Sequence, residues 1–373
     1  MKLFKNIRWR RFATTLIMLL MVVGYNAATW GATGPGASIY NAAINNPNYP
    51  SDTIDAQLKK LTAEAWIMVD ADENVILSSK NPDKILYPAS MTKMMTCILA
   101  IESGYLNETV TISKTAASTS YGSVKRGEKY KLHDLLYRVM LPSDNGAAQA
   151  VGEFLSSRDT VSFPTMMNNK AKKLKMKSTN FVNAHGLPDN NHYSTAHDMM
   201  LLLKYCMKNE TFAEIVSKRS CSISTMTGTR INLKSTNRLF DKYEGCIGVK
   251  TGTTRAAGGC LASAVVRGGR KIYLVIMKCE PARERTDESI VLYNKGFDMI
   301  AKAKSTNRES ANNKRDYGKR NNVYFDDNGH DTRNVPRPNK SNVEDNKRVG
   351  DQNVPARQQL RKQMKNYNHD SRL

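Results

Sequence analysis

The sequence lacks one cysteine pattern and has few acidic residues. No Cys-x-x-Cys pair occurs among the six cysteines, so neither a zinc motif nor a redox motif is indicated. A chain of 373 residues does not need disulfides for stability, and we expect most of the cysteines to be free and buried. Acidic residues are few, with 34 Asp and Glu against 56 Lys and Arg. The 40% hydrophobic content still indicates a globular core, and it excludes a wholly disordered or multi-span membrane protein.

The apolar run from Phe12 to Gly24 is too short for a typical membrane span. Its 13 residues rise about 20 Å as a helix, against a hydrocarbon core of roughly 30 Å. Basic residues precede the run and small residues follow it, which is the layout of a secretory signal. We therefore expect residues 1–31 to be a signal peptide, with a permanent span as the alternative. The mature protein is then exported, to the cell wall or the outer face of the cytoplasmic membrane.

Export changes the interpretation of the formal charge of +22. Outside the cytoplasm the available polyanions are lipid headgroups and wall polymers, and not nucleic acid. Residues 305–373 hold 13 Asn, 15 basic and 9 acidic residues with few apolar ones, which predicts a disordered basic tail. This tail is a candidate for binding an anionic wall polymer or a membrane surface, and solvated surface charge is the alternative.

We expect residues 32–60 to form a lead-in segment and residues 61–304 to form the folded domain.

Strand and helix patterns alternate within the folded domain. Two hairpins and three helices are predicted, with hairpin strands at 65–69 and 75–79 and at 259–267 and 271–279, and helices at 90–101, 132–140 and 287–301. The middle helix must end before Pro142. The two hairpins, separated by a helical middle, predict an α+β fold with one antiparallel sheet and helices packed on it.

The segment Ser90-Met91-Thr92-Lys93 places a hydroxyl and an amine one helical turn apart. An uncharged Lys93 could take the serine proton and create an alkoxide nucleophile. An exposed lysine has a pKa near 10.4 and does this poorly, so the mechanism needs burial and a second cation nearby. An ordinary amphipathic helix explains the same four residues.

The segment Ser143-Asp144-Asn145 lies between two helical patterns. Its hydroxyl and amide could relay a proton and hold a substrate amide. A helix cap before Gly146 is the alternative explanation.

The segment Lys250-Thr251-Gly252 follows the strand-like run Ile247–Val249, and Thr253 comes next. A strand edge of this kind lets a peptide-like substrate lie against the backbone, and the glycine avoids a side-chain clash. Lys250 would be the second cation. A solvent-exposed strand end is the alternative.

In this order the three segments resemble the motif set of the penicillin-recognising serine enzymes. Further likeness narrows the resemblance to the D-alanyl-D-alanine carboxypeptidases of the S11 family, which are low-molecular-mass penicillin-binding proteins. It is carried by the box Tyr87–Lys93, by Asn183–Leu187, by His192–Met199 and by Arg285 before Gly296-Phe297. It covers about Ala63 to Ile300.

The resemblance implies a reaction and a set of catalytic residues. Ser90 would attack the carbonyl between the two D-alanines of a peptidoglycan stem pentapeptide and form an acyl-enzyme, with Lys93 as the base. Ser143 and Asn145 would pass a proton to the leaving amine and position the peptide. Lys250 would lower the pKa of its neighbours. Penicillin and other β-lactams would acylate the same serine, and neither a metal nor another cofactor is implied.

The resemblance also implies how the substrate is bound. Thr251 and Arg285 would hold the free carboxylate, with Gly252 at the strand edge beside them. The oxyanion would lie between the backbone N–H groups of Ser90 and Thr253. The implied fold is that of β-lactamases and DD-peptidases, with helices on both faces of the sheet and a mainly helical subdomain. The β-rich domain and amphipathic helix that often follow in this family have no counterpart in the tail, so anchoring of that kind is not expected.

Three other functions fit parts of the sequence. A β-lactamase would need a deacylating glutamate, and neither Glu153 nor Glu214 lies in the expected Glu-x-x-Leu-Asn box. A zinc peptidase could use His185, His192 and His197, although no His-x-x-x-His pattern accompanies them. A wall-binding penicillin-binding protein without turnover is the third alternative.

Overall fold

A computed structural model describes residues 56–320 of the chain. The predicted signal peptide, nearly all of the lead-in segment and residues 321–373 of the tail therefore lie outside the described residues. The chain divides into two units, Met1–Thr306 and Asn307–Leu373, and the following description concerns the first. Within residues 56–320, no helix combines the length and the apolar character needed to cross a membrane.

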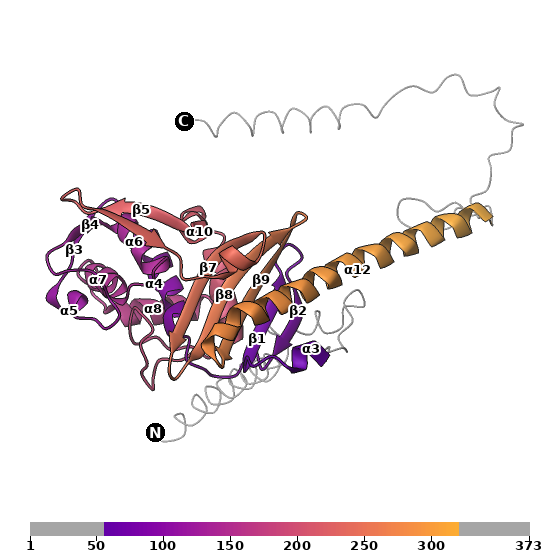
Figure 1. Cartoon of the computed structure of the whole chain (residues 1–373), viewed down its shortest axis with the longest axis horizontal. Coiled ribbons are helices and arrows are strands. Elements are labelled where there is room, and N and C mark those ends of the chain that lie inside the picture. Colours follow the sequence, from indigo (N-terminus) through magenta and orange to yellow (C-terminus); the bar gives the residue numbers. More distant parts are fainter. Residues whose placement is uncertain (1–55, 321–373) are drawn as a thin grey trace, which may run out of the picture. The chain divides into compact units, whose positions relative to one another are not determined.

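One antiparallel sheet of five strands organises the first unit (Figure 1). Its strand order is β2-β1-β9-β8-β7, with β1 at Ala65–Asp70, β2 at Val75–Lys80, β7 at Cys246–Thr254, β8 at Gly258–Arg267 and β9 at Arg270–Cys279. The two predicted hairpins are present as β1–β2 and β8–β9. They join through β1 and β9, where Trp66 pairs with Ile276. The prediction that the first and last hairpins share one sheet is confirmed.

Helices cover both faces of this sheet. The α-helices are α3 Ala56–Lys59, α4 Lys93–Glu102, α5 Lys114–Ala117, α6 Leu132–Met140, α7 Asn145–Ser156, α8 Phe163–Lys173, α9 Ala196–Cys206, α10 Glu210–Ser217, α11 Leu239–Lys242 and α12 Arg285–Arg320, with 3₁₀ turns η1 Ala89–Thr92 and η2 Ala282–Glu284. Side chains alternate along the strands, so Ile67 belongs to the core with α4, α6, α7 and α9, and Trp66 to the core with α12. The predicted α+β fold is confirmed.

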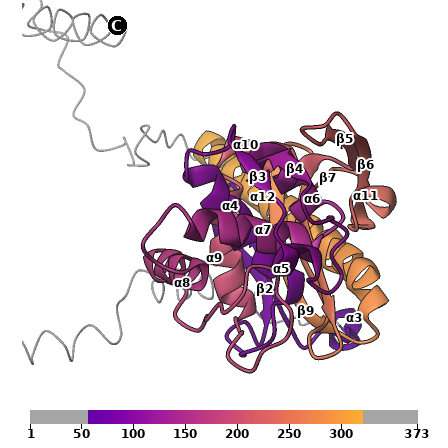
Figure 2. The same cartoon turned by 90° about the vertical axis from the view of Figure 1, so that its left-hand side faces the viewer.

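Two short ribbons, which were not predicted, pack against α6 and α7. Strands β3 (Thr109–Thr111) and β4 (Lys129–Lys131) form the first, and β5 (Ser220–Ser224) and β6 (Arg230–Lys234) form the second. Figure 2 shows α4 and α7 from this side of the molecule. The turn of the second ribbon bonds to the first through the Met226 N–H and the Lys129 carbonyl, at 2.8 Å.

The predicted end of the last helix at Ala301 is wrong, because α12 continues to Arg320. Residues 305–320, which belong to the segment predicted to be disordered, are therefore helical. Residues 302–320 contain no proline, and their Ala, Lys, Arg and Glu residues favour a helix, whereas their Ser, Thr, Asn and Gly residues do not. The prediction rested on the shortage of apolar residues, and that criterion measures packing and not local propensity.

Candidate active site

The turn that carries Ser90 is held by two close backbone contacts. Ser90 lies in η1 and Lys93 begins α4, so the helix starts at the lysine. Ala89 has a φ of 47°, a left-handed conformation that non-glycine residues rarely adopt. A Cβ on Gly186 would lie 1.9 Å from the Ala89 carbonyl oxygen, and one on Gly252 would lie 3.0 Å from the Ala89 Cβ. Because Gly186 and Gly252 have no side chain, the segments that contain them can pack closely against the turn that carries Ser90.

The Lys93 amine lies between three oxygen atoms. Its Nζ is 2.9 Å from Ser90 Oγ, 2.6 Å from Asn145 Oδ1 and 2.7 Å from the His185 carbonyl oxygen. The amide and carbonyl oxygens can only accept hydrogen bonds, so they take two N–H groups of the amine. In the neutral amine the remaining position is a lone pair that faces Ser90. This is the geometry of a general base hydrogen-bonded to its nucleophile.

Burial and a second lysine favour the uncharged form of this amine. The pKa of Lys93 is held well below its ordinary value, first by burial and then by the positive charge of Lys250, while Asp144 opposes the shift. Lys250 is itself buried, and burial followed by the charge of Arg285 lowers its pKa to about 7. The second cation that the chemistry of Lys93 requires is therefore present, on β7.

The second motif serves both as a helix cap and as part of the site. Asp144 precedes α7, and its carboxylate accepts a hydrogen bond from the Ala147 N–H at 3.0 Å. Asn145 contacts Lys93 through Oδ1, and its amide nitrogen donates to the Ser120 carbonyl at 2.7 Å. These two bonds fix the orientation of the amide. Ser143 has a φ of 66°, and within residues 56–320 its hydroxyl makes no hydrogen bond.

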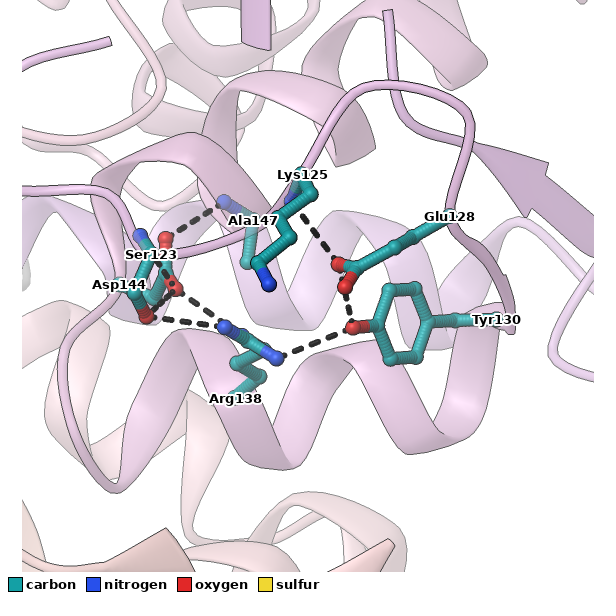
Figure 3. A network of polar contacts seen from close by, with 7 residues as sticks. All are labelled: Ser123, Lys125, Glu128, Tyr130, Arg138, Asp144 and Ala147. Carbon is teal, nitrogen blue, oxygen red and sulfur yellow. Dashed lines mark hydrogen bonds and ion pairs between the residues drawn. The ribbon is translucent and has the colours of Figure 1, made fainter. Parts of the chain in front are cut away.

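A buried polar network supports this motif from behind (Figure 3). Arg138 of α6 points toward Asp144 and Ser123 on one side and toward Tyr130 on the other, with distances of 2.9, 2.9 and 3.0 Å. Ser123 also donates to Asp144 at 2.7 Å, and Tyr130 donates to Glu128 at 2.8 Å. The arginine side chain is 7% exposed and its aspartate partner 1% exposed. Asn145 therefore starts a helix whose first turn is held by an ion pair.

The third motif lies inside an edge strand and not at the end of one. The predicted strand run at 247–249 is too short, because β7 extends through Thr254 and pairs along its length with β8. Arg285 donates to the Gly252 carbonyl at 3.1 Å and also bonds the Thr253 hydroxyl. The predicted residues Lys250 to Thr253 and Arg285 are thus brought to one edge of the sheet, next to η1.

Two partners of the site were missed from the sequence. The Thr236 hydroxyl lies 2.5 Å from that of Thr251, and the Thr236 N–H donates to the Leu141 carbonyl. The His185 carbonyl that bonds Lys93 is the other. Thr236 lies two residues beyond an exposed ribbon, where no motif indicates a role. The His185 partner is a main-chain oxygen, which every residue has. Neither partner could therefore be recognised from the sequence.

The three histidines do not converge on one point. The Val182 N–H donates to Nδ1 of His192 at 3.2 Å, so its Nε2 carries the proton and donates to the Thr92 hydroxyl at 2.8 Å. His197 bonds Asp83, and His185 accepts from the Leu187 N–H. Burial lowers the pKa of His185 and of His192 to about 4, so both are neutral at pH 7. In the described part of the chain, no group of three potential ligands could hold a metal ion.

The cysteines and the two glutamates considered for deacylation have structural positions. All six cysteines are free and four of them are buried, as predicted. Glu153 accepts from Ser113 at 2.6 Å, and Glu214 accepts from Tyr137 at 3.3 Å. Neither glutamate bonds Ser90.

Comparison with known proteins agrees with this geometry. The D-alanyl-D-alanine carboxypeptidase family, peptidase family S11, matches residues 52–280. The chain is 33% identical to the carboxypeptidase DacF of Bacillus subtilis over 230 residues, which are 60% of this chain and 59% of DacF. It is 30% identical to DacB2 of Mycobacterium tuberculosis over 248 residues, which are 65% of this chain and 84% of DacB2.

Solved structures give the same result for the fold. The DD-transpeptidase of Streptomyces K15 superposes with a TM-score of 0.60 at 28% identity, covering 64% of this chain and 98% of that protein. Penicillin-binding protein D2 of Listeria monocytogenes, in its ampicillin-bound form, superposes with a TM-score of 0.57 at 29% identity, with the same coverage. Because the family match spans most of the chain and includes all three motifs, the chain belongs to the D-alanyl-D-alanine carboxypeptidase family of serine peptidases.

Proposed function

We propose that the protein removes the terminal D-alanine from peptidoglycan stem pentapeptides during cell-wall maturation. The observation that carries the proposal is the Lys93 amine, which lies 2.9 Å from Ser90 Oγ and whose pKa is held well below its ordinary value by burial and Lys250. Ser90 Oγ attacks the carbonyl between the two D-alanines as its proton passes to Lys93. The C–N bond then breaks, and the leaving amine takes a proton through Ser143, with Asn145 positioning the peptide.

The substrate lies along β7 in this proposal. Thr251 and Arg285 bind the terminal carboxylate, and the carbonyl oxygen points between the N–H groups of Ser90 and Thr253. Removing one such donor typically lowers kcat by about a hundredfold to a thousandfold. Water then hydrolyses the acyl-enzyme and releases the shortened peptide. Gly252 also has a structural role, because its missing side chain leaves room for the nucleophile turn.

β-Lactams would acylate the same serine. Support comes from the Listeria relative, which was solved with ampicillin bound. We also propose that residues 1–31 are a signal peptide, that the mature enzyme acts outside the cytoplasm, and that its basic tail contacts an anionic wall polymer or membrane surface. N-terminal sequencing of the exported protein tests the first point, and a mature chain that still begins at Met1 would contradict it.

The central test is incubation with diacetyl-L-Lys-D-Ala-D-Ala and, separately, with ampicillin. We expect D-alanine release and a mass adduct on the native chain, neither of them in Ser90→Ala, and both in the control Ser157→Ala, an exposed serine. Equal release by Ser90→Ala would refute the assignment. Rapid turnover of ampicillin would favour a β-lactamase, and a stable adduct without D-alanine release would favour a wall-binding protein.

A further inference from the structure

A pocket of about 530 Å³ opens beside the carboxylate-binding end of β7. Thr253 and Arg285 form one wall, and the segment after β6, together with η2, forms the rest. Lys234, Arg238 and Arg283 also line it. The proposed function accounts for Arg285 and leaves the other three cations without a role.

The charges around this pocket are not balanced. Arg283 pairs with Glu284 at 3.3 Å, and Asp241 of the lining pairs with Arg219. Lys234 and Arg238 are exposed and have no anionic partner within residues 56–320.

Arg285 adds a third uncompensated charge, because its hydrogen-bond partners, the Gly252 carbonyl and the Thr253 hydroxyl, are both neutral. Burial lowers the pKa of Arg285, and repulsion by Arg238 lowers it further. Both guanidinium groups line the same pocket, so their charges act on one enclosed space.

One terminal carboxylate neutralises only one of these three charges. We propose that Lys234 and Arg238 form a second anion subsite, which selects a terminal D-residue that carries a side-chain carboxylate as well as its α-carboxylate. The inference rests on the proposed function and deepens it. With the α-carboxylate at Thr251 and Arg285, the side chain of a terminal D-glutamate extends into the pocket and places its carboxylate near Lys234 and Arg238. A terminal D-alanine leaves this part of the pocket to solvent.

The test compares two peptides that differ only in charge, diacetyl-L-Lys-D-Ala-D-Glu and diacetyl-L-Lys-D-Ala-D-Gln. We expect the native chain to cleave the glutamate peptide with a kcat/KM about 2- to 30-fold higher, which is the range that two exposed ion pairs of ordinary strength give. In Lys234→Gln and in Arg238→Gln the ratio falls toward one. In Lys208→Gln, an exposed lysine on another part of the surface, it is unchanged. The ratio compares the two peptides on the same variant. A smaller folded fraction lowers both rates equally and leaves the ratio unchanged.

The same pair is compared by calorimetry on Ser90→Ala, which measures binding without turnover. Tighter binding of the glutamate peptide, lost in Ser90→Ala/Lys234→Gln, supports the subsite even if no peptide is cleaved. Equal affinity for both peptides overturns the inference, as does a preference that Lys208→Gln reduces equally, because that result indicates only the general positive field. Failure of the proposed function gives a different result, which is the absence of D-alanine release from diacetyl-L-Lys-D-Ala-D-Ala.

Discussion

Replacing Lys250 with methionine should stabilise the fold while abolishing activity. Lys250 is 1% exposed, and its pKa falls from 10.5 to about 7, mainly through burial and then through Arg285. A difference of about 3.5 in pKa corresponds to about 5 kcal/mol of unfolding free energy at pH 6, where the lysine is protonated in both states. Methionine has a similar volume, so the packing loss should stay below about 1.5 kcal/mol.

The sign and the pH dependence of this effect follow from linkage. The unfolded chain binds more protons than the folded one between pH 7 and pH 10.5, so this lysine makes the native fold more stable as pH rises through that window. The free energy of unfolding of Lys250→Met should therefore exceed that of the native chain by about 5 kcal/mol at pH 6 and by about 2 kcal/mol at pH 9.

Urea unfolding followed by circular dichroism at both pH values measures this advantage. The control Lys208→Met replaces an exposed lysine and should stay within about 0.5 kcal/mol of the native chain. A gain that is equal at pH 6 and pH 9, or a loss at pH 6, would refute the reasoning.

Three further predictions concern the support of the site and its pH profile. Arg138→Met leaves a buried carboxylate without its ion partner and should lower the free energy of unfolding by about 3–5 kcal/mol; a loss below 1 kcal/mol in urea would contradict this. Gly104 and Gly186 both have positive φ, but only a Cβ on Gly186 meets the Ala89 carbonyl. Gly104→Ala should therefore lower the free energy of unfolding by about 1–2 kcal/mol. Gly186→Ala should lower it by more and should also slow acylation by ampicillin. Equal effects of the two substitutions would argue against the contact between Gly186 and Ala89. The kcat/KM should decline above about pH 7 as Lys250 loses its proton, and Lys250→Arg should move that decline to higher pH; an unmoved decline would assign it to another group.

The two hairpins of the main sheet could be predicted because their strands carry local signals. The turns at 70–74 and 268–270 are polar or glycine-rich, and alternating or continuous apolar runs flank them. The second ribbon, in contrast, fully buries only Ile223 and Leu233, while Cys221 and Ile231 pack against the core as partly buried side chains. Its strands do alternate between polar and apolar residues, as in Arg230-Ile231-Asn232-Leu233-Lys234, but two apolar side chains per strand are a weaker signal than the longer runs of the main sheet, and the ribbon was not predicted.

The predicted site residues were identified by motif order, and the structure supplies the physical reason for their proximity. Ser90 and Lys93 are neighbours on one turn, which the sequence predicts directly. Asn145 reaches Lys93, and the strand that carries Lys250 comes to lie against η1, only through the packing of α7 and β7, which no local pattern encodes. Arg138 was missed because it lies on a helix with an apolar stripe, where an arginine is expected to face solvent.

The most direct test of this account is the protonation state of Lys93 in the folded protein. Lysine labelled with ¹³C at Cε reports each ammonium group by NMR, and Lys93→Arg identifies the signal. We expect the Lys93 signal to change from that of an ammonium to that of a neutral amine at a pH well below 10.5. A Lys93 signal that titrates near pH 10 would show that the amine is charged beside Ser90, and it would contradict the proposed activation of the serine.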